Sequence, residues 1–206
     1  METFKQFLEE QGSNTLVFAF GRYNPPTRGH IQHFQAMREF AAKYGARYEI
    51  FISKTVDHKK NPVSVEDRIA YIQKAAPALL PPTPETNMFS VVEQLAGGRT
   101  KHLIYMAGSD YFDGASDQAM LTRLKSWAAE KGIELTVQTT GGREIGISGT
   151  VLRQAAMNND FKTFLSASPV GMGRLTERDV AEMFQLTKQG LSAAPVKKPR
   201  VKPPVV

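Results

Sequence analysis

Short apolar runs alternate along this chain with longer stretches in which apolar residues recur every three or four positions. Four short runs are rich in β-branched and aromatic residues and have the length of buried strands; they lie at residues 15–20, 47–53, 102–108 and 133–139. The longer stretches predict amphipathic helices; they lie at residues 2–11, 28–45, 64–76, 87–98, 115–132, 148–160, 160–168 and 176–190. Strand and helix patterns therefore alternate through most of the chain.

This alternation predicts an α/β fold, in which an open parallel sheet with right-handed crossovers carries helices on both faces. The last two predicted helices have no strand after them and are expected to follow the sheet as C-terminal additions to one domain, residues 1–190. A proline-rich segment with Pro81, Pro82 and Pro84 is predicted to be a loop. In parallel sheets of this kind ligands bind beyond the carboxyl ends of the strands.

Residues 191–206 differ in composition from the rest of the chain. They carry four basic residues, Lys197, Lys198, Arg200 and Lys202, and no acid; without these four, 22 of the 26 basic residues remain against 20 acidic ones. The segment is rich in proline and valine without an apolar period, which predicts a disordered tail. Two interpretations stay open: a solubilising end, or a weak contact with nucleic acid or another acidic partner.

Several classes of protein are excluded by composition. The 206 residues include no cysteine, which excludes disulfides and thiolate metal sites. The sequence has no run of 18 apolar residues that could cross a membrane, and its N-terminus lacks the apolar region of a secretory signal. We therefore expect a cytoplasmic protein without a membrane partner, and a homo-oligomer is compatible with the sequence.

The segment after the first predicted strand reads "GRYNPPTRGH". Pro25 and Pro26 stiffen the exit from the strand, and Gly29 allows a ligand to come close to the backbone where the next helix begins. A helix N-terminus beside Arg28 and His30 suits a phosphate group. The alternative is an ordinary turn with its polar groups satisfied.

A second segment of this kind, "GGREIGISGTVLR", follows the fourth predicted strand. Ser148 or Thr150 can cap the next helix, and Thr150 and Arg153 share one face near its positive end. A hydroxyl, helix N–H groups and a guanidinium fork suit the oxygens of a polyphosphate. Two such segments at the strand ends of one sheet predict a binding site for a nucleoside triphosphate.

These two segments carry a resemblance to a known family. "TRGH" resembles the T/H-x-G-H signature of the nucleotidyltransferase superfamily, and "ISGTVLR" resembles its second signature, I-S-x-T-x-x-R. The resemblance covers about residues 15–160 and implies a Rossmann-like fold with this segment as its core. It also implies transfer of a nucleotidyl group from ATP or CTP to a phosphate or another acceptor, with release of pyrophosphate.

The branch of the superfamily is indicated by neighbouring residues. The Gly-Arg pair after the first strand and "NPVSVEDR" after the second resemble the archaeal-type nicotinamide-mononucleotide adenylyltransferases. Those enzymes have His where this chain has Thr27, and Thr is typical of phosphopantetheine adenylyltransferases, which do not usually show the other two features. "NPPTRGH" also resembles cytidylyltransferase-like proteins of bacteriophages, for which the location would be the host cytoplasm.

The resemblance implies roles for individual residues. His30, with Thr27, would donate to the α-phosphate and stabilise the transition state; Arg153 and Thr150, with the N–H groups around Ser148 and Gly149, would hold the β- and γ-phosphates. The segment that leaves the first strand would complete the nucleotide site; its residues are Gly21, Arg22, Tyr23, Arg28 and Gly29. Mg²⁺ would bridge the phosphates, held mainly by substrate and water.

Four further residues, Arg68, Ser109, Asp110 and His33, are candidates for the site, and three of them have an alternative interpretation. Arg68 either faces the nucleotide or acceptor, as in the adenylyltransferases, or is an exposed helix charge. Ser109 and Asp110 follow the third strand and are expected at the acceptor site; Asp110 either binds a ribose hydroxyl or caps a turn. His33 lies three positions after His30, a spacing that suits a metal, but no third ligand is evident and no metal site is predicted.

The predicted function is therefore transfer of an adenylyl group from ATP to a phosphate acceptor such as nicotinamide mononucleotide. Two alternatives stay open. The first is a cytidylyltransferase, or an adenylyltransferase with another acceptor; the second is a non-catalytic module that binds nucleotide, nucleic acid or a protein. The presence of His30, Thr150 and Arg153 together favours an enzyme.

Overall fold

The computed structural model describes residues 14–96, 98–108, 114–140 and 147–193. Twelve helices and strands follow one another in this part of the chain: β1 (Thr15–Gly21), α2 (Arg28–Lys43), β2 (Arg47–Ser53), α3 (Val65–Ala75), β3 (Thr83–Glu85), α4 (Met88–Ala96), β4 (His102–Gly108), α5 (Ala115–Glu130), β5 (Glu134–Thr140), α6 (Gly149–Met157), α7 (Phe161–Ala167) and α8 (Glu177–Ser192). The predicted helix 2–11 and most of the predicted tail lie outside the described residues.

The five strands form one parallel sheet in the order β3-β2-β1-β4-β5. The chain moves outward from β1 to β3, then returns to the other side of β1 for β4 and β5. The order therefore reverses between β1 and β4, and this is the switch point where such sheets bind their ligands. The predicted Rossmann-like open sheet is confirmed.

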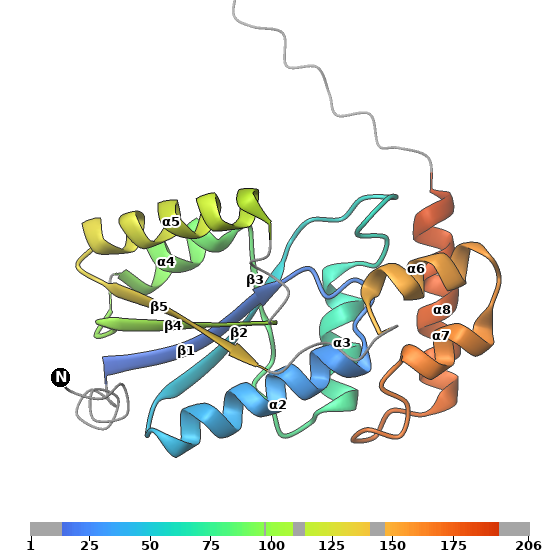
Figure 1. Ribbon diagram of the computed structural model, residues 1–206. Coiled ribbons are helices and arrows are strands. Elements are labelled where there is room, and N and C mark those ends of the chain that lie inside the picture. Colours follow the sequence, from blue (N-terminus) through green and yellow to red (C-terminus); the bar gives the residue numbers. More distant parts are fainter. Residues whose placement is uncertain (1–13, 97, 109–113, 141–146, 194–206) are drawn as a thin grey trace, which may run out of the picture.

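Two apolar cores cover the two faces of the sheet. Val17 and Ala19 of β1 face one core with Ile31 and Phe34 of α2, while Phe18 on the opposite face joins the second core. Successive strand residues point to opposite faces, so a continuous apolar run such as β1 is buried on both. Figure 1 shows α4 and α5 on one side of the sheet and α2 on the other, with α6, α7 and α8 beyond the strands' carboxyl ends.

The strand β3 lies in the segment that was predicted to be a loop, so that prediction is wrong. Pro84 cannot donate a ladder hydrogen bond, which is why the segment does not resemble a strand in sequence. At the edge of a sheet this loss is tolerated because one side of the strand has no partner strand. Phe51, for example, pairs with Thr83, and Ser53 pairs with Glu85.

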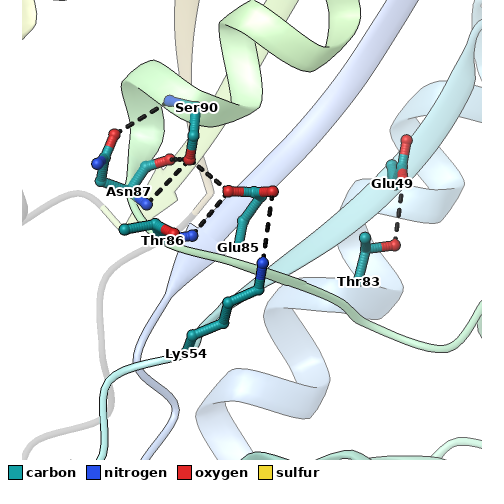
Figure 2. Close-up of polar contacts among 7 residues, drawn as sticks. All are labelled: Glu49, Lys54, Thr83, Glu85, Thr86, Asn87 and Ser90. Atoms are coloured by element: carbon teal, nitrogen blue, oxygen red, sulfur yellow. Dashed lines mark hydrogen bonds and ion pairs between the residues drawn. The ribbon is translucent and has the colours of Figure 1, made fainter.

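Polar side chains hold β3 at the edge (Figure 2). The carboxylate of Glu85 accepts hydrogen bonds from the Thr86 N–H, at 2.7 Å, and from the Ser90 hydroxyl, and the Lys54 Nζ lies 3.9 Å from it. These contacts, led by the Ser90 hydrogen bond, lower the pKa of Glu85. The Thr83 hydroxyl donates to Glu49 at 3.1 Å, so β3 is tied to β2 by side chains as well as by backbone.

The last helix packs closely against the loop that precedes α3. A Cβ added to Gly190 would lie 2.0 Å from the carbonyl oxygen of Pro62, so only glycine fits this contact. α8 continues to Ser192, and Leu191 packs against the core, so the helix includes two residues that the sequence assigned to the tail. No helix in the described part of the chain is long and apolar enough to span a membrane.

We expect Gly190→Ala to destabilise the protein by about 1–3 kcal/mol, because backbone must move to admit the methyl group. Alanine has the higher helix propensity, so any loss must come from this contact. Thermal unfolding measures it, with a fall in Tm of about 2–4 °C per kcal/mol for a chain of this size. Gln189→Ala, on the exposed side of α8, is the matched control, and an unchanged Tm in Gly190→Ala would contradict the close approach.

Candidate active site

A cavity of about 440 Å³ opens at the carboxyl ends of β1 and β4, beside the first residues of α2 and α6. It lies at the switch point of the sheet, where the sequence predicted a site. Ten of the residues predicted for the site line it: Gly21, Arg22, Tyr23, Thr27, Gly29, His30, Ser148, Gly149, Thr150 and Arg153. The fold therefore brings the two sequence motifs, more than 100 residues apart, to one cavity.

Asn24 attaches the loop between β1 and α2 to the segment that precedes α3. Its side chain is only 2% exposed; its amide donates to the carbonyl of Val63 at 2.9 Å and accepts from the Val63 N–H at 3.1 Å. These two hydrogen bonds satisfy both polar groups of the Asn24 side chain and both backbone groups of Val63. The place is buried, where an unmade hydrogen bond is costly. Asn24 is absent from the predicted site because its partner lies 39 residues away.

The start of α2 is organised by a capping box between Thr27 and His30. The Thr27 hydroxyl accepts from the His30 N–H at 3.3 Å, and the Nδ1 atom of His30 accepts from the Thr27 N–H at 3.0 Å. Thr27 is 1% exposed, and its hydroxyl also lies 3.1 Å from the Nδ1 atom of His30. The structure thus shows that Thr27 holds His30; its donation to a phosphate, which the resemblance implied, stays a prediction.

The capping box also sets the tautomer of His30. A nitrogen that accepts a hydrogen bond carries no proton, so in the neutral ring the proton lies on Nε2. The imidazole lines the cavity, and in this tautomer its ring N–H group is at Nε2. A hydrogen-bond donor held in a fixed place can stabilise a negative charge that develops beside it.

The start of α6 forms the opposite wall of the cavity. Ser148 is its N-cap and accepts from the Val151 N–H at 3.2 Å, which resolves the choice between Ser148 and Thr150. The guanidinium of Arg153 donates to the Thr150 hydroxyl at 2.9 Å and to the Asn24 carbonyl at 2.6 Å. Arg153 therefore ties the second motif directly to the first.

Positive charge gathers at this wall. Burial lowers the pKa of Arg153, and the nearby charge of Arg22 lowers it further, while Asp57 opposes the shift. Arg22 is exposed and lines the same cavity. Two guanidinium groups that repel each other across a cavity are stabilised when an anion binds between them.

His33 does not pair with His30 as a metal ligand would. Its Nδ1 atom lies 2.7 Å from the Thr140 hydroxyl at the end of β5. Burial lowers the pKa of His33 to about 4, although a hydrogen bond to the Met106 backbone opposes the shift. His33 is therefore neutral at pH 7 and joins α2 to β5, the strand at the edge of the sheet. No group of three residues able to hold a metal occurs among the described residues.

The lowered pKa of His33 predicts a loss of stability in mild acid. Below pH 6.5, the ordinary pKa of histidine, the unfolded chain binds a proton at His33. In the folded chain His33 stays neutral down to about pH 4. Stability therefore rises with pH across this window, by up to about 3 kcal/mol from this residue. Urea unfolding between pH 4 and 7 should show a shallower pH dependence in His33→Asn than in the parent. His58→Gln is the control, and equal slopes in His33→Asn and the parent would contradict the assignment.

Two predicted residues do not reach the cavity. Arg28 donates to the Ser166 carbonyl on α7 at 3.2 Å, so it joins α2 to a C-terminal helix and does not line the cavity. Arg68 is 0% exposed, which rules out an exposed helix charge, and it does not line the cavity either. Ser109 and Asp110 lie outside the described residues.

The guanidinium of Arg68 is occupied by backbone carbonyls. It donates to Ser64 at 3.0 Å, to Ser53 at 3.0 Å and to Arg22. Burial lowers its pKa to about 10. Arg68 therefore joins the ends of β1 and β2 to α3.

The fold is an α/β fold with a parallel sheet, and two helix N-termini and two arginines at its switch point form a site that suits phosphate groups. Residues 18–155 match the cytidylyltransferase-like family, and the chain belongs to this family within the nucleotidyltransferase superfamily. Among solved structures it is similar to Thermotoga maritima TmcAL bound with alpha-thio ATP, with 11% identity and a TM-score of 0.48. That match covers 84% of this chain and 55% of the Thermotoga chain, so this chain spans little more than half of its length. Comparison with curated proteins found no match.

Proposed function

We propose that this protein transfers an adenylyl group from ATP to a phosphate acceptor such as nicotinamide mononucleotide, with release of pyrophosphate. The observation that carries the proposal is the meeting of the α2 and α6 N-termini with Arg22 and Arg153 at one cavity. Each helix N-terminus has N–H groups without intrahelical acceptors and a positive dipole end. A chain of three phosphates needs more than one such anion-binding wall, and the family supplies the reaction class.

In the proposed reaction an acceptor phosphate oxygen attacks the α-phosphorus of ATP. A new P–O bond forms there as the bond to the α–β bridging oxygen breaks, and pyrophosphate leaves with that electron pair. His30 donates from Nε2 to an α-phosphate oxygen, where negative charge grows in the transition state. Arg153 and Thr150, at the start of α6, hold the β- and γ-phosphates. No residue of the chain becomes covalently attached.

Magnesium enters this proposal as part of the substrate. The described residues that line the cavity include no Asp or Glu, so they do not form a protein-held Mg²⁺ site. Mg²⁺ is commonly bound through substrate phosphates and water, and we expect it to arrive bound to ATP. The adenine preference and the acceptor come from the sequence resemblance, which favours the adenylyltransferase branch.

A substrate screen tests the proposal. The purified protein is incubated with each of the four common nucleoside triphosphates and Mg²⁺, against a panel that includes nicotinamide mononucleotide, phosphopantetheine and simple sugar phosphates. We expect pyrophosphate release that requires both ATP and one acceptor, with a product mass equal to acceptor plus adenylyl. If pyrophosphate were released with CTP and an acceptor but not with ATP, the proposed adenylyl transfer would be replaced by cytidylyl transfer. Tight nucleotide binding without turnover on any acceptor would identify a non-catalytic binding module.

A further inference from the structure

Tyr23, the second residue after the end of β1, has an unusual backbone conformation. Its φ is 45°, in the left-handed region that bulky side chains rarely occupy. The other non-glycine residue with positive φ in the described chain is Asn159, just after α6, and Asn tolerates this conformation well. Strain at a bulky residue persists only where surrounding contacts enforce it, and such residues gather at functional sites.

Buried polar groups enforce the conformation from both sides. The carbonyl of Arg22, which belongs to the peptide bond before Tyr23, accepts a hydrogen bond from the buried guanidinium of Arg68. The next residue, Asn24, is held by its two hydrogen bonds to Val63. The backbone on one side of Tyr23 is therefore attached to α3, and on the other side to the segment that precedes α3.

The strained conformation places the Tyr23 ring between the end of β1 and the first turns of α2. The ring leaves no room for a side chain at residue 21, because a Cβ on Gly21 would lie 2.6 Å from it. The ring centroid lies 5.0 Å from that of His30 at 71°, and 4.8 Å from that of Phe34 at 88°. Only 8% of Tyr23 is exposed. Its ring is thus committed to the protein and is not a platform for a nucleotide base.

We infer that Tyr23 is a positioning residue for His30. The Thr27 N–H and hydroxyl both contact the imidazole at Nδ1, and a tilt of the ring would lengthen the Nδ1 hydrogen bond that sets its tautomer. The edge-to-face contact with Tyr23 restricts the tilt, because aromatic pairs of this kind have a preferred geometry. Together the two contacts hold the Nε2–H donor at the cavity wall. The kinetic part of this inference rests on the proposed function; the geometric part does not.

Two variants disturb the ring in different ways. Tyr23→Ala removes it, and Gly21→Ala displaces it by placing a methyl group where the ring lies. Tyr23→Phe keeps the ring and tests whether the hydroxyl contributes. Tyr44→Ala, at the opposite end of α2, is the matched control because Tyr44 packs on Phe40 away from the cavity.

The first measurement is the ¹⁵N NMR spectrum of the His30 ring in the full chain. We expect the parent, Tyr23→Phe and Tyr44→Ala to show one tautomer with the proton on Nε2, and Tyr23→Ala and Gly21→Ala to show exchange between tautomers. The second is kcat with ATP and the identified acceptor, for which we expect a loss of about tenfold to a hundredfold in these two variants, as expected for a donor out of place. Their ATP affinity should change less than threefold.

The outcomes separate the inference from the proposed function. If the screen finds no transfer but the tautomers mix in Tyr23→Ala, the proposed function fails and the positioning role stands. If Tyr23→Ala and Gly21→Ala are folded and keep a single Nε2–H tautomer, the positioning role is wrong whatever the activity. Should Tyr23→Ala not fold, Tyr23→Leu, which keeps volume without an aromatic edge, takes its place with the same expected spectrum.

Discussion

His30→Ala is expected to lower kcat by about 10²–10³-fold, the usual loss when one donor to a developing charge is removed. ATP affinity should change little, because the proposed contact becomes strong only when charge grows on the α-phosphate. Steady-state pyrophosphate release gives kcat, and ATP titration of the protein without acceptor gives the affinity. A variant that keeps near-normal kcat would remove His30 from the mechanism.

The capping box makes a sharper version of this experiment possible. His30→Ala removes both the Nε2 donor and the Nδ1 acceptor that the Thr27 N–H uses. His30→Asn keeps an acceptor near the Nδ1 position and loses the donor, whereas His30→Gln extends an amide toward the Nε2 position. If the Nε2 donor matters, His30→Asn should be as inactive as His30→Ala, and His30→Gln should recover part of kcat. If only the helix cap matters, His30→Asn should recover kcat and His30→Gln should not.

Arg153→Lys is expected to weaken ATP binding and slow turnover together. The guanidinium reaches the Asn24 carbonyl and the Thr150 hydroxyl with two different nitrogens, and lysine cannot reproduce this fork. If Arg153 contacts the outer phosphates, the loss should be largest for ATP, smaller for ADP and absent for AMP. Calorimetric titration of the three nucleotides into parent and variant measures the series.

The control for this series is Arg38→Lys, an arginine of α2 that donates to the Ala78 carbonyl outside the cavity. It should bind all three nucleotides as the parent does. Equal losses for ATP and AMP in Arg153→Lys would show that Arg153 acts through its contact with Asn24, by holding the loop after β1. The polyphosphate role would then be wrong, and the α6 wall would lose its main anion-binding side chain.

The contrast between Arg153 and Arg68 shows how burial separates two similar side chains. Both donate to backbone carbonyls of the loop after β1. Arg153 is half-buried and lines the cavity, whereas Arg68 is fully enclosed. A guanidinium that fills a closed site can act on a ligand only through the backbone that it holds. This is why we assign the phosphates to Arg153 and the support of Arg22 and Tyr23 to Arg68.

The sequence by itself determined the sheet and the place of the site. Alternating apolar runs and amphipathic stretches predict a parallel sheet, and in such a sheet every strand's carboxyl end reaches the same edge. The segments at Thr27–His30 and Ser148–Arg153 follow two of those ends, so their meeting at one cavity was predictable. Local chemistry sufficed here, because each helix start is made from residues three positions apart.

Only the tertiary structure decided which polar residues reach the cavity. The hydrogen-bond partner of Asn24 is 39 residues away in the sequence. Arg68 bonds to a residue 46 positions away, and Arg28 to one 138 positions away. No local pattern reports such pairs, because a side chain's direction depends on packing between elements. The same holds for β3, whose proline is acceptable only at a sheet edge. It holds as well for Tyr23, whose conformation is imposed by Arg68 of α3 and by Val63 in the segment before it.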